Sequence, residues 1–125
     1  MQNVAVNGCT LQLSAGTGNI SITNAPSQKV KCDGKEAYKG QIQFSISNYM
    51  GTNIVNGDGQ GSGSINGTSR CLKIEGAAAV LQNDTSETVT VIGTKPSSSG
   101  SGVEPATDSV TVKVSNAGQA KVKAE

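Results

Sequence analysis

Apolar and polar residues alternate along most of this chain. The alternation occurs in the segments VAV, LQL, ISI, QIQFSI, TVTVI and SVTVKV. A period of two places every second side chain on one face of a strand, and Val, Ile and Thr favour strands. Turn-forming pairs that begin at Asn7, Asp33 and Asn56 separate these segments. The pattern predicts an all-β protein made of short antiparallel strands and hairpins.

Two segments rich in Gly and Ser interrupt the alternation. Residues 56–64 read NGDGQGSGS, and residues 96–105 read PSSSGSGVEP. We interpret both as flexible loops, because this composition is typical of loops and linkers. The helix-like segment EGAAAVLQND is too short to predict a helix. Since strand patterns resume on both sides of each loop, we predict one domain over residues 1–125.

One phrase recurs three times along the chain. It reads NAPSQKVKCDG from Asn24, NGTSRCLKIEG from Asn66 and NAGQAKVKAE from Asn116. We place the repeat copies at about 20–40, 64–84 and 110–125, and the third copy stops before the glycine of the other two. Repeats of this spacing are typical of stacked or radial architectures.

The first two copies share a serine, an apolar residue, an acidic residue followed by glycine, and an alanine, and the third copy shares the apolar and the acidic position. These positions are Ser27, Val30, Gly34 and Ala37 in the first copy, Ser69, Leu72, Gly76 and Ala79 in the second, and Val122 in the third. Each copy predicts a strand, a short turn and a strand, and in the first two copies the acidic residue with its glycine reverses the chain again. Three such copies predict three arms around a pseudo-threefold axis, a body that can sit on a threefold partner.

Composition and charge narrow the function. Hydrophobic residues make up 34% of the chain, and the aromatic residues are Tyr38, Phe44 and Tyr49. Such a chain has a thin core and relies on backbone pairing or on assembly with a partner. The net charge is +1 without a basic stripe, so we do not expect nucleic acid as a partner.

No catalytic constellation stands out in the sequence. The chain has no histidine, which excludes Ser-His-Asp and Cys-His arrangements. The Gly-rich segment from Asn56 lacks a phosphate-loop motif. Asp33 and Glu75 occupy equivalent turns, where turn chemistry explains them better than acid–base catalysis. We therefore expect a protein that is not an enzyme and has no small-molecule substrate.

The three cysteines are Cys9, Cys32 and Cys71. Their odd number and the absence of a CxxC motif disfavour a disulfide framework, and we interpret them as small buried hydrophobic residues. They are also the candidate metal ligands. Cys71 aligns with Lys29 and Cys32 with Ile74, which places the two on opposite faces of equivalent strands, so we expect no metal and no other cofactor.

At the repeated phrase the chain resembles the PAAR and PAAR-like proteins. Their repeated element runs as a serine, an apolar residue, a turn glycine, small residues and a Gly-Asp pair. Ser27, Val30, Gly34, Ala37 and Gly40 match it in the first copy, and Ser69, Leu72, Gly76, Ala79 and Asp84 match it in the second. The segments KEAY and AAAV stand in place of the Pro-Ala-Ala-Arg tetrapeptide, and the histidine with which many members hold a metal is missing.

The resemblance implies a small all-β cone that caps a trimeric β-helical spike. Such spikes belong to type VI secretion systems, phage tails and other contractile injection systems. The implied partners are a trimeric spike protein, of the valine-glycine repeat or phage type, and transiently the target membrane. The lysines that flank Val30, Val122 and Leu72 are then either a solvated face or a contact to an acidic spike rim.

The amino-terminal segment has no basic region followed by an apolar run, and no apolar stretch of membrane length occurs. We therefore expect a protein that is made in the cytoplasm without a signal peptide. The resemblance implies that it is then assembled on an injection particle or virion and delivered outside the cell. Two alternatives remain open: another structural virion or baseplate module, such as a decoration or adaptor protein, and a surface binding module such as an adhesin domain.

Overall fold

The computed structural model describes residues 1–125 except residues 99 and 101. All its regular elements are β-strands, so the predicted all-β fold is confirmed. The strands within the described residues are β1 (Gln2–Asn3), β2 (Thr10–Leu13), β3 (Thr17–Ile22), β4 (Lys31–Cys32), β5 (Lys35–Glu36), β6 (Gln41–Met50), β7 (Gly59–Asn66), β8 (Lys73–Ile74), β9 (Ala77–Ala78), β10 (Val89–Pro96), β11 (Val103–Val110), β12 (Val112–Asn116) and β13 (Lys123–Ala124). Neighbouring strands pair antiparallel throughout.

Long strands surround the core of a central body. Strands β11, β10, β7, β6 and β3 form one sheet in that order, and β12 pairs with β2. Only Thr111 separates β11 from β12, and β12 also bonds to the residues just before β10, through Ser86 N–H to Val112 O at 2.7 Å and Val114 N–H to Asp84 O at 2.9 Å. With β11 and β12 taken as one bent strand, the order around the body is β2, β12/β11, β10, β7, β6 and β3.

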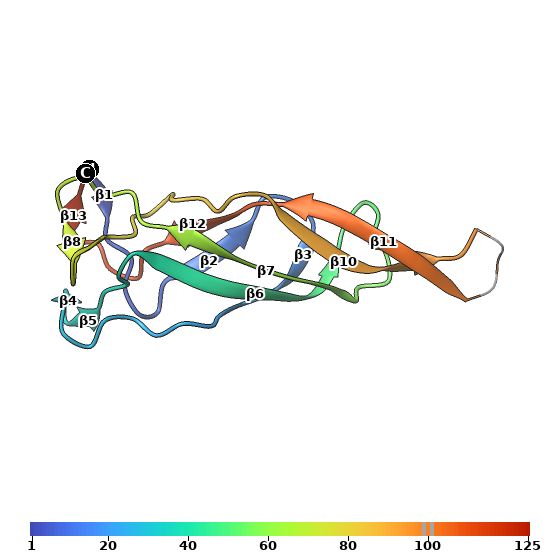
Figure 1. Ribbon diagram of the computed structural model, residues 1–125, viewed down its shortest axis with the longest axis horizontal. Coiled ribbons are helices and arrows are strands. Elements are labelled where there is room, and N and C mark those ends of the chain that lie inside the picture. Colours follow the sequence, from blue (N-terminus) through green and yellow to red (C-terminus); the bar gives the residue numbers. More distant parts are fainter. Residues whose placement is uncertain (99, 101) are drawn as a thin grey trace.

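Three short hairpins lie together at one end of the long axis (Figure 1). They pair Lys31 with Glu36 in β4–β5, Lys73 with Ala78 in β8–β9, and Lys123 with Asn3 in β13–β1. The first two hairpins belong to the first two copies of the repeated phrase. The third joins the third copy, which contains β13, to β1 from the opposite end of the sequence, so the strand that this copy lacks is supplied by Gln2–Asn3.

The chain alternates between short and long hairpins. It leaves β1, runs out along β2 and back along β3, and forms β4–β5. It then runs out along β6, back along β7, and forms β8–β9 before a last excursion along β10, β11 and β12 leads to β13. Figure 1 shows the β10–β11 hairpin reaching furthest from the short hairpins. The molecule therefore repeats one unit three times, a short hairpin followed by a long segment that runs out and back.

Backbone contacts between the short hairpins follow the same threefold pattern. Isolated bridges join Val6 to Ala37, Lys39 to Ala79, and Leu81 to Val4. A second set of hydrogen bonds runs from Asn7 N–H to Glu36 O at 2.7 Å, from Gly40 N–H to Ala78 O at 3.1 Å, and from Gln82 N–H to Asn3 O at 2.8 Å. Each hairpin unit contacts the next in cyclic order, so the three close into a ring around a pseudo-threefold axis.

The buried residues form two clusters along this axis. The larger cluster lies in the body and contains Phe44, Tyr49 and several aliphatic residues of β6, β10 and β12. The smaller one lies inside the ring of short hairpins and contains Val4, Ile74 and Leu81. Because few side chains are large, each cluster is thin and the backbone ladders around it remain close together.

The interpretation of residues 56–64 as a flexible loop is wrong for most of the segment. Gly59–Asn66 is strand β7, which lies between β10 and β6 in the sheet. Its glycines alternate with polar residues, and they face the core where a side chain would not fit. A Cβ at Gly63 would lie 2.8 Å from Val89 Cγ2, and a Cβ at Gly59 would lie 2.8 Å from Tyr49 Cβ. The glycines are thus the inward positions of a closely packed strand.

The second proposed loop, residues 96–105, is shorter than expected. Pro96 is the last residue of β10 and Val103 is the first of β11, and the two are paired with each other. The connection between them spans residues 97–102, of which 99 and 101 lie outside the described residues. Proline is tolerated here because Pro96 ends its strand.

Candidate functional site

The three short hairpins and the segments that enter and leave them form the candidate site. We call this region, residues 1–6, 27–39, 69–81 and 117–125, the three-hairpin end. It contains every position that the repeated phrase singled out. The structure brings these positions together around one axis, although they lie far apart in the sequence.

The first two hairpins turn on an acidic residue followed by glycine, as the repeat predicted. The φ angles are 54° at Asp33 and 77° at Gly34, and 53° at Glu75 and 87° at Gly76. Two successive residues with positive φ are the requirement of the tightest hairpin turn, which matches the twist of the strands. A Cβ at either glycine would meet no atom within 4 Å, so the backbone conformation alone favours glycine there.

A polar side chain organises the entry to each hairpin. Ser27 Oγ accepts hydrogen bonds from Lys29 N–H at 3.2 Å and Val30 N–H at 3.3 Å. Ser69 Oγ accepts from Leu72 N–H at 3.0 Å. These bonds satisfy backbone donors in the irregular segment that leads into the strand. Both serines are nearly fully buried.

Gln119 holds the equivalent position in the third hairpin. Its Oε1 accepts from Lys121 N–H and Val122 N–H, both at 2.8 Å. Its Nε2 donates to Val4 O and Val122 O, also at 2.8 Å. The longer side chain therefore accepts the backbone hydrogen bonds that the serines accept, and it also bonds to the backbone of Val4 in the partner segment. Sequence reasoning missed this residue, because a glutamine does not match a serine in a pattern, although its offset in the repeat is the same.

Contacts between the hairpins run in one cyclic direction. Ser27 Oγ donates to Glu75 Oε2 at 2.5 Å, which links the first hairpin to the second. Ser69 Oγ donates to Glu125 O at 2.8 Å, which links the second to the third. Lys121 Nζ lies 3.7 Å from Asp33 Oδ1, which links the third to the first. The acidic turn positions therefore each contact the entry segment of a neighbouring hairpin.

The Ser27 bond also affects the charge of Glu75. This hydrogen bond holds the pKa of the Glu75 carboxyl below its ordinary value, and the nearby Lys39 and Lys29 ammonium groups lower it further. Hydrogen bonding to the ionised form and a neighbouring positive charge both favour the carboxylate. Glu75 is thus an anion held in the ring by its neighbours, a structural role that agrees with its place in a turn.

Apolar side chains fill the inside of the ring. They form three sets of equivalent positions, one residue from each hairpin. The sets are Val30, Leu72 and Val122; Cys32, Ile74 and Ala124; and Ala37, Ala79 and Val4. Val4 was not recognised as a repeat position, because its segment comes from the other end of the chain. The signal was present, since the apolar run from Val4 to Val6 corresponds to the run from Ala79 to Leu81.

Two further residues that match the PAAR element lie beside the ring. Gly40 has a φ of 73°, and a Cβ there would lie 3.2 Å from Ala77 Cβ. Asp84 accepts hydrogen bonds from Thr68 Oγ1 at 2.5 Å and from Leu81 N–H at 2.8 Å. Both residues shape the exit of the chain from a hairpin toward the body.

Positive charge is concentrated at the three-hairpin end. Eight of the ten Lys and Arg residues lie there, with four of the nine Asp and Glu residues, which gives this end a formal charge of +4 and the rest of the molecule −3. Lys31, Lys73 and Lys123 occupy equivalent positions of the three hairpins and are exposed. None of these three forms a salt bridge with another described residue.

The cysteines lie in three different environments. Cys9 belongs to the cluster of the body, Cys32 to the cluster inside the ring, and Cys71 is exposed. The interpretation as buried hydrophobic residues is therefore confirmed for Cys9 and Cys32 and wrong for Cys71, which lies in the irregular segment before β8. Within the part of the chain that the structure describes, no three His, Cys, Asp or Glu residues could together hold a metal ion.

Comparisons with family models, with curated proteins and with solved structures returned no match. In the described residues the chain forms no helix with the length and apolar character that crossing a membrane requires.

Proposed function

We propose that this protein is a structural, non-enzymatic tip that caps a threefold-symmetric spike of a contractile injection system or phage tail. The observation that carries the proposal is the closed ring of three short hairpins, in which the same backbone bridge recurs three times in cyclic order. A single chain with pseudo-threefold symmetry can present one similar surface to each subunit of a trimer.

The three-hairpin end is the end that binds the spike. Its hairpins have equal length and equivalent contacts, whereas the far end is uneven, because the β10–β11 hairpin extends beyond the other two (Figure 1). Only the even end offers matching contacts to three identical subunits. The far end, narrowed to one hairpin, then leads toward the target envelope.

Charge indicates the chemistry of the spike surface. Exposed lysines at equivalent positions 31, 73 and 123 fit one acidic group on each subunit of the partner. Complementary charges of this kind mainly raise the association rate and fix the orientation of the complex. They also make binding weaker as the salt concentration rises.

The test is binding to a purified trimeric β-helical spike protein, with the stoichiometry measured by native mass spectrometry. We expect one copy per trimer. Reversing the three charges with Lys31→Glu, Lys73→Glu and Lys123→Glu should weaken binding by at least about tenfold. The control is Lys95→Glu with Lys113→Glu, which lie outside the three-hairpin end and should leave binding unchanged.

Other stoichiometries would point elsewhere. Three copies per trimer, or six or more per particle, would contradict a tip and favour a decoration or adaptor protein. Equal weakening by both sets of charge reversals would contradict the assignment of the binding end, since a non-specific electrostatic attraction does not distinguish the two regions.

A further inference from the structure

The body has a seam that its own strands leave open. Going around the body, each strand bonds to the next from β2 through β12/β11, β10, β7 and β6 to β3. The last seam would join β3 to β2. These two strands are connected by residues 14–16 alone, yet within the described residues they do not pair with each other.

The threefold pattern makes this opening unexpected. The long hairpin β6–β7 pairs along its length, and so does β10–β11. By the same pattern β2 should pair with β3. Each of the two instead bonds only to a strand of another hairpin, β2 to β12 and β3 to β6. Two strand edges therefore face each other across a gap.

The two pairings that flank the seam are irregular. The pairing of β3 with β6 shifts register between Thr17 and Asn19, and the pairing of β12 with β2 shifts between Val114 and Asn116. Bulges of this type bend a strand and increase its twist. At the closed end of the seam, the Tyr49 ring lies directly under Gly16, where an added Cβ would be 2.5 Å from Tyr49 Oη.

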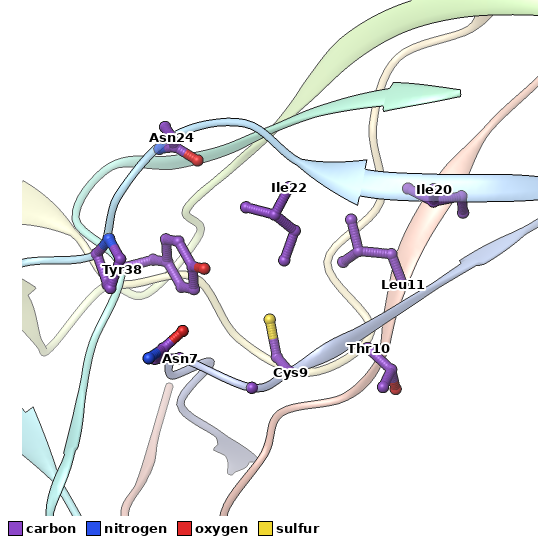
Figure 2. Close-up of a pocket in the computed structure, with 10 residues that line it drawn as sticks. Asn7, Cys9, Thr10, Leu11, Ile20, Ile22, Asn24 and Tyr38 are labelled. Carbon is purple, nitrogen blue, oxygen red and sulfur yellow. The ribbon is translucent and has the colours of Figure 1, made fainter. Parts of the chain in front are cut away.

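The gap is an uncharged groove with room for a chain segment, and its lining is both apolar and polar, the latter from Asn7, Thr10 and Asn24. Figure 2 shows Leu11, Ile22, Cys9 and Tyr38 around the space between β2 and β3. The cavity has a volume of about 530 Å³. Leu11, Ile20 and Ile22 are partly buried against the core of the body, so they offer an apolar floor that is not fully covered.

The groove carries no charge at neutral pH. Neither Lys, Arg, Asp nor Glu lines it. Burial raises the pKa of the Cys9 thiol to about 11, and burial also raises the pKa of the Tyr38 hydroxyl. A guest with a charged inward side chain would lose its hydration without gaining a partner, so the complementary guest is neutral on that face.

We propose that an extended, uncharged segment of a partner protein enters this seam as an additional β-strand between β2 and β3. A strand is the ligand that can bond to both facing edges at once, and alternate aliphatic side chains would cover Leu11, Ile20 and Ile22. The edge of a folded second copy does not fit, because its other edge is already occupied by its own sheet. This inference is independent of the proposed function.

A synthetic strand provides the test. The probe is the capped neutral heptapeptide SVTVTVS, and binding is followed by NMR with amide hydrogen exchange on the full chain. We expect new protection of backbone amides in both β2 and β3. Two methylated peptides sharpen the result: one carries N-methyl groups on its valines and the other on its threonines. Successive amides of a strand point to opposite edges, so each version disables one edge.

Insertion between two strands requires both edges of the guest. Each methylated peptide should therefore bind at least about tenfold more weakly than the unmodified one. Replacing the central valine of the peptide with lysine should weaken binding in the same way. Loss of affinity with only one methylated peptide would overturn the proposal, since it would mean simple addition to a single exposed edge.

Variants of the protein complete the test. Ile20→Thr with Ile22→Thr keeps β-forming residues but removes the apolar floor, and it should weaken peptide binding. Ile92→Thr makes the same change at an exposed position of β10, and it should leave peptide binding unchanged. A thermal melt of each variant separates lost binding from lost folding. The proposal would be overturned if the peptide does not bind. It would also be overturned if the amides of β2 and β3 that face the seam are already protected in the free protein, either as a monomer or as a dimer.

Discussion

Gln119 takes the place in the third hairpin that serine holds in the other two. Its amide group has four hydrogen bonds within the ring, to the backbone of Val4, Lys121 and Val122. A serine hydroxyl could accept the same bonds from residues two and three positions ahead, but it could not donate to two carbonyl oxygens at once. The Gln119 side chain thus stabilises the pairing of β13 with β1, two strands that no turn connects.

Removal of this side chain should be costly. Gln119→Ala leaves buried backbone groups without partners, and we expect the free energy of unfolding to fall by about 2–4 kcal/mol. Urea denaturation followed by circular dichroism measures the change. Gln28→Ala, at an exposed position of the first copy, is the control and should change stability by less than about 0.5 kcal/mol. Equal effects of the two substitutions would contradict the role of Gln119.

Glu75 links stability to pH through its bond to Ser27. Because the pKa in the folded state is lowered, the contribution is present above the ordinary carboxyl pKa and is lost as the pH falls through the folded value. Ser27→Ala should raise the pKa of Glu75, as seen by NMR titration of its carboxyl carbon. The stability difference between the parent and this variant should shrink in acid.

Ser69→Ala is the matched control for that titration. The Ser69 hydroxyl bonds to the main-chain oxygen of Glu125 and not to the side chain of Glu75, so its removal should leave the titration of Glu75 unchanged. A pKa of Glu75 that stays constant in Ser27→Ala would show that the hydrogen bond is not its main cause.

The cysteines should differ in reactivity. The thiolate is the reactive form, and burial raises the pKa of Cys9 and Cys32, while Cys71 is exposed. We expect iodoacetamide at pH 7.5 to modify Cys71 rapidly and the other two slowly, with all three modified in denaturant. Mass spectrometry of peptides measures the rates. Rapid modification of Cys32 in the folded protein would contradict the closed packing inside the ring.

At the scale of elements, β7 shows how composition can mislead. Its sequence GQGSGSIN is rich in the residues of flexible linkers, yet it alternates with a period of two when glycine is counted as an inward residue. The short hairpins were predictable because an acidic residue followed by glycine specifies a turn locally. The glycine strand was not, because the need for a missing side chain arises from Val89 and Phe44, which lie elsewhere in the sequence.

Filling one of these positions tests the packing of β7. A Cβ at Gly63 would lie 2.8 Å from Val89 Cγ2 and 3.0 Å from Phe44 Cζ. Gly63→Ala should therefore reduce the free energy of unfolding by about 1–3 kcal/mol, as overpacking does in other cores. Urea denaturation gives the value. Ser62→Ala, on the exposed face of the same strand, should have little effect, and a stabilised Gly63→Ala would contradict the close approach.

The whole molecule could be predicted in part. The residues that the repeated phrase relates lie in the three-hairpin end, because the turn and strand signals of the phrase are local to each copy. The closure of the ring and the path of the long strands were not accessible, since they depend on pairings such as Val112 with Leu13 between distant segments. The open seam is a property of register and bulges, which alternating residues alone do not specify.

Joining the ends of the described chain tests the third hairpin. In the alignment of the ring, Glu125 corresponds to Glu75 and Met1 to Gly76. A backbone-cyclised protein with Met1→Gly would thus have the same turn in all three hairpins. We expect the free energy of unfolding to rise by about 2–4 kcal/mol relative to the linear Met1→Gly chain, because cyclisation restricts the unfolded state.

Calorimetry of the cyclic and linear forms measures this gain. A cyclic form with three extra glycines at the junction is the control and should gain less, since it cannot form the two-residue turn. A direct junction that lowers stability would mean that Gln2 and Ala124 do not have the register of the other two hairpins.

The long strands leave the ring as three separate segments. The number of residues in each segment can therefore change independently of the ring. The β10–β11 hairpin is already longer than β2 and β3 while the ring contacts stay equivalent. Residues could be inserted or removed at its outer end in pairs, one for each strand, without changing any pairing nearer the ring. Homologous chains could thus differ in the length of this hairpin and still keep the same three-hairpin end.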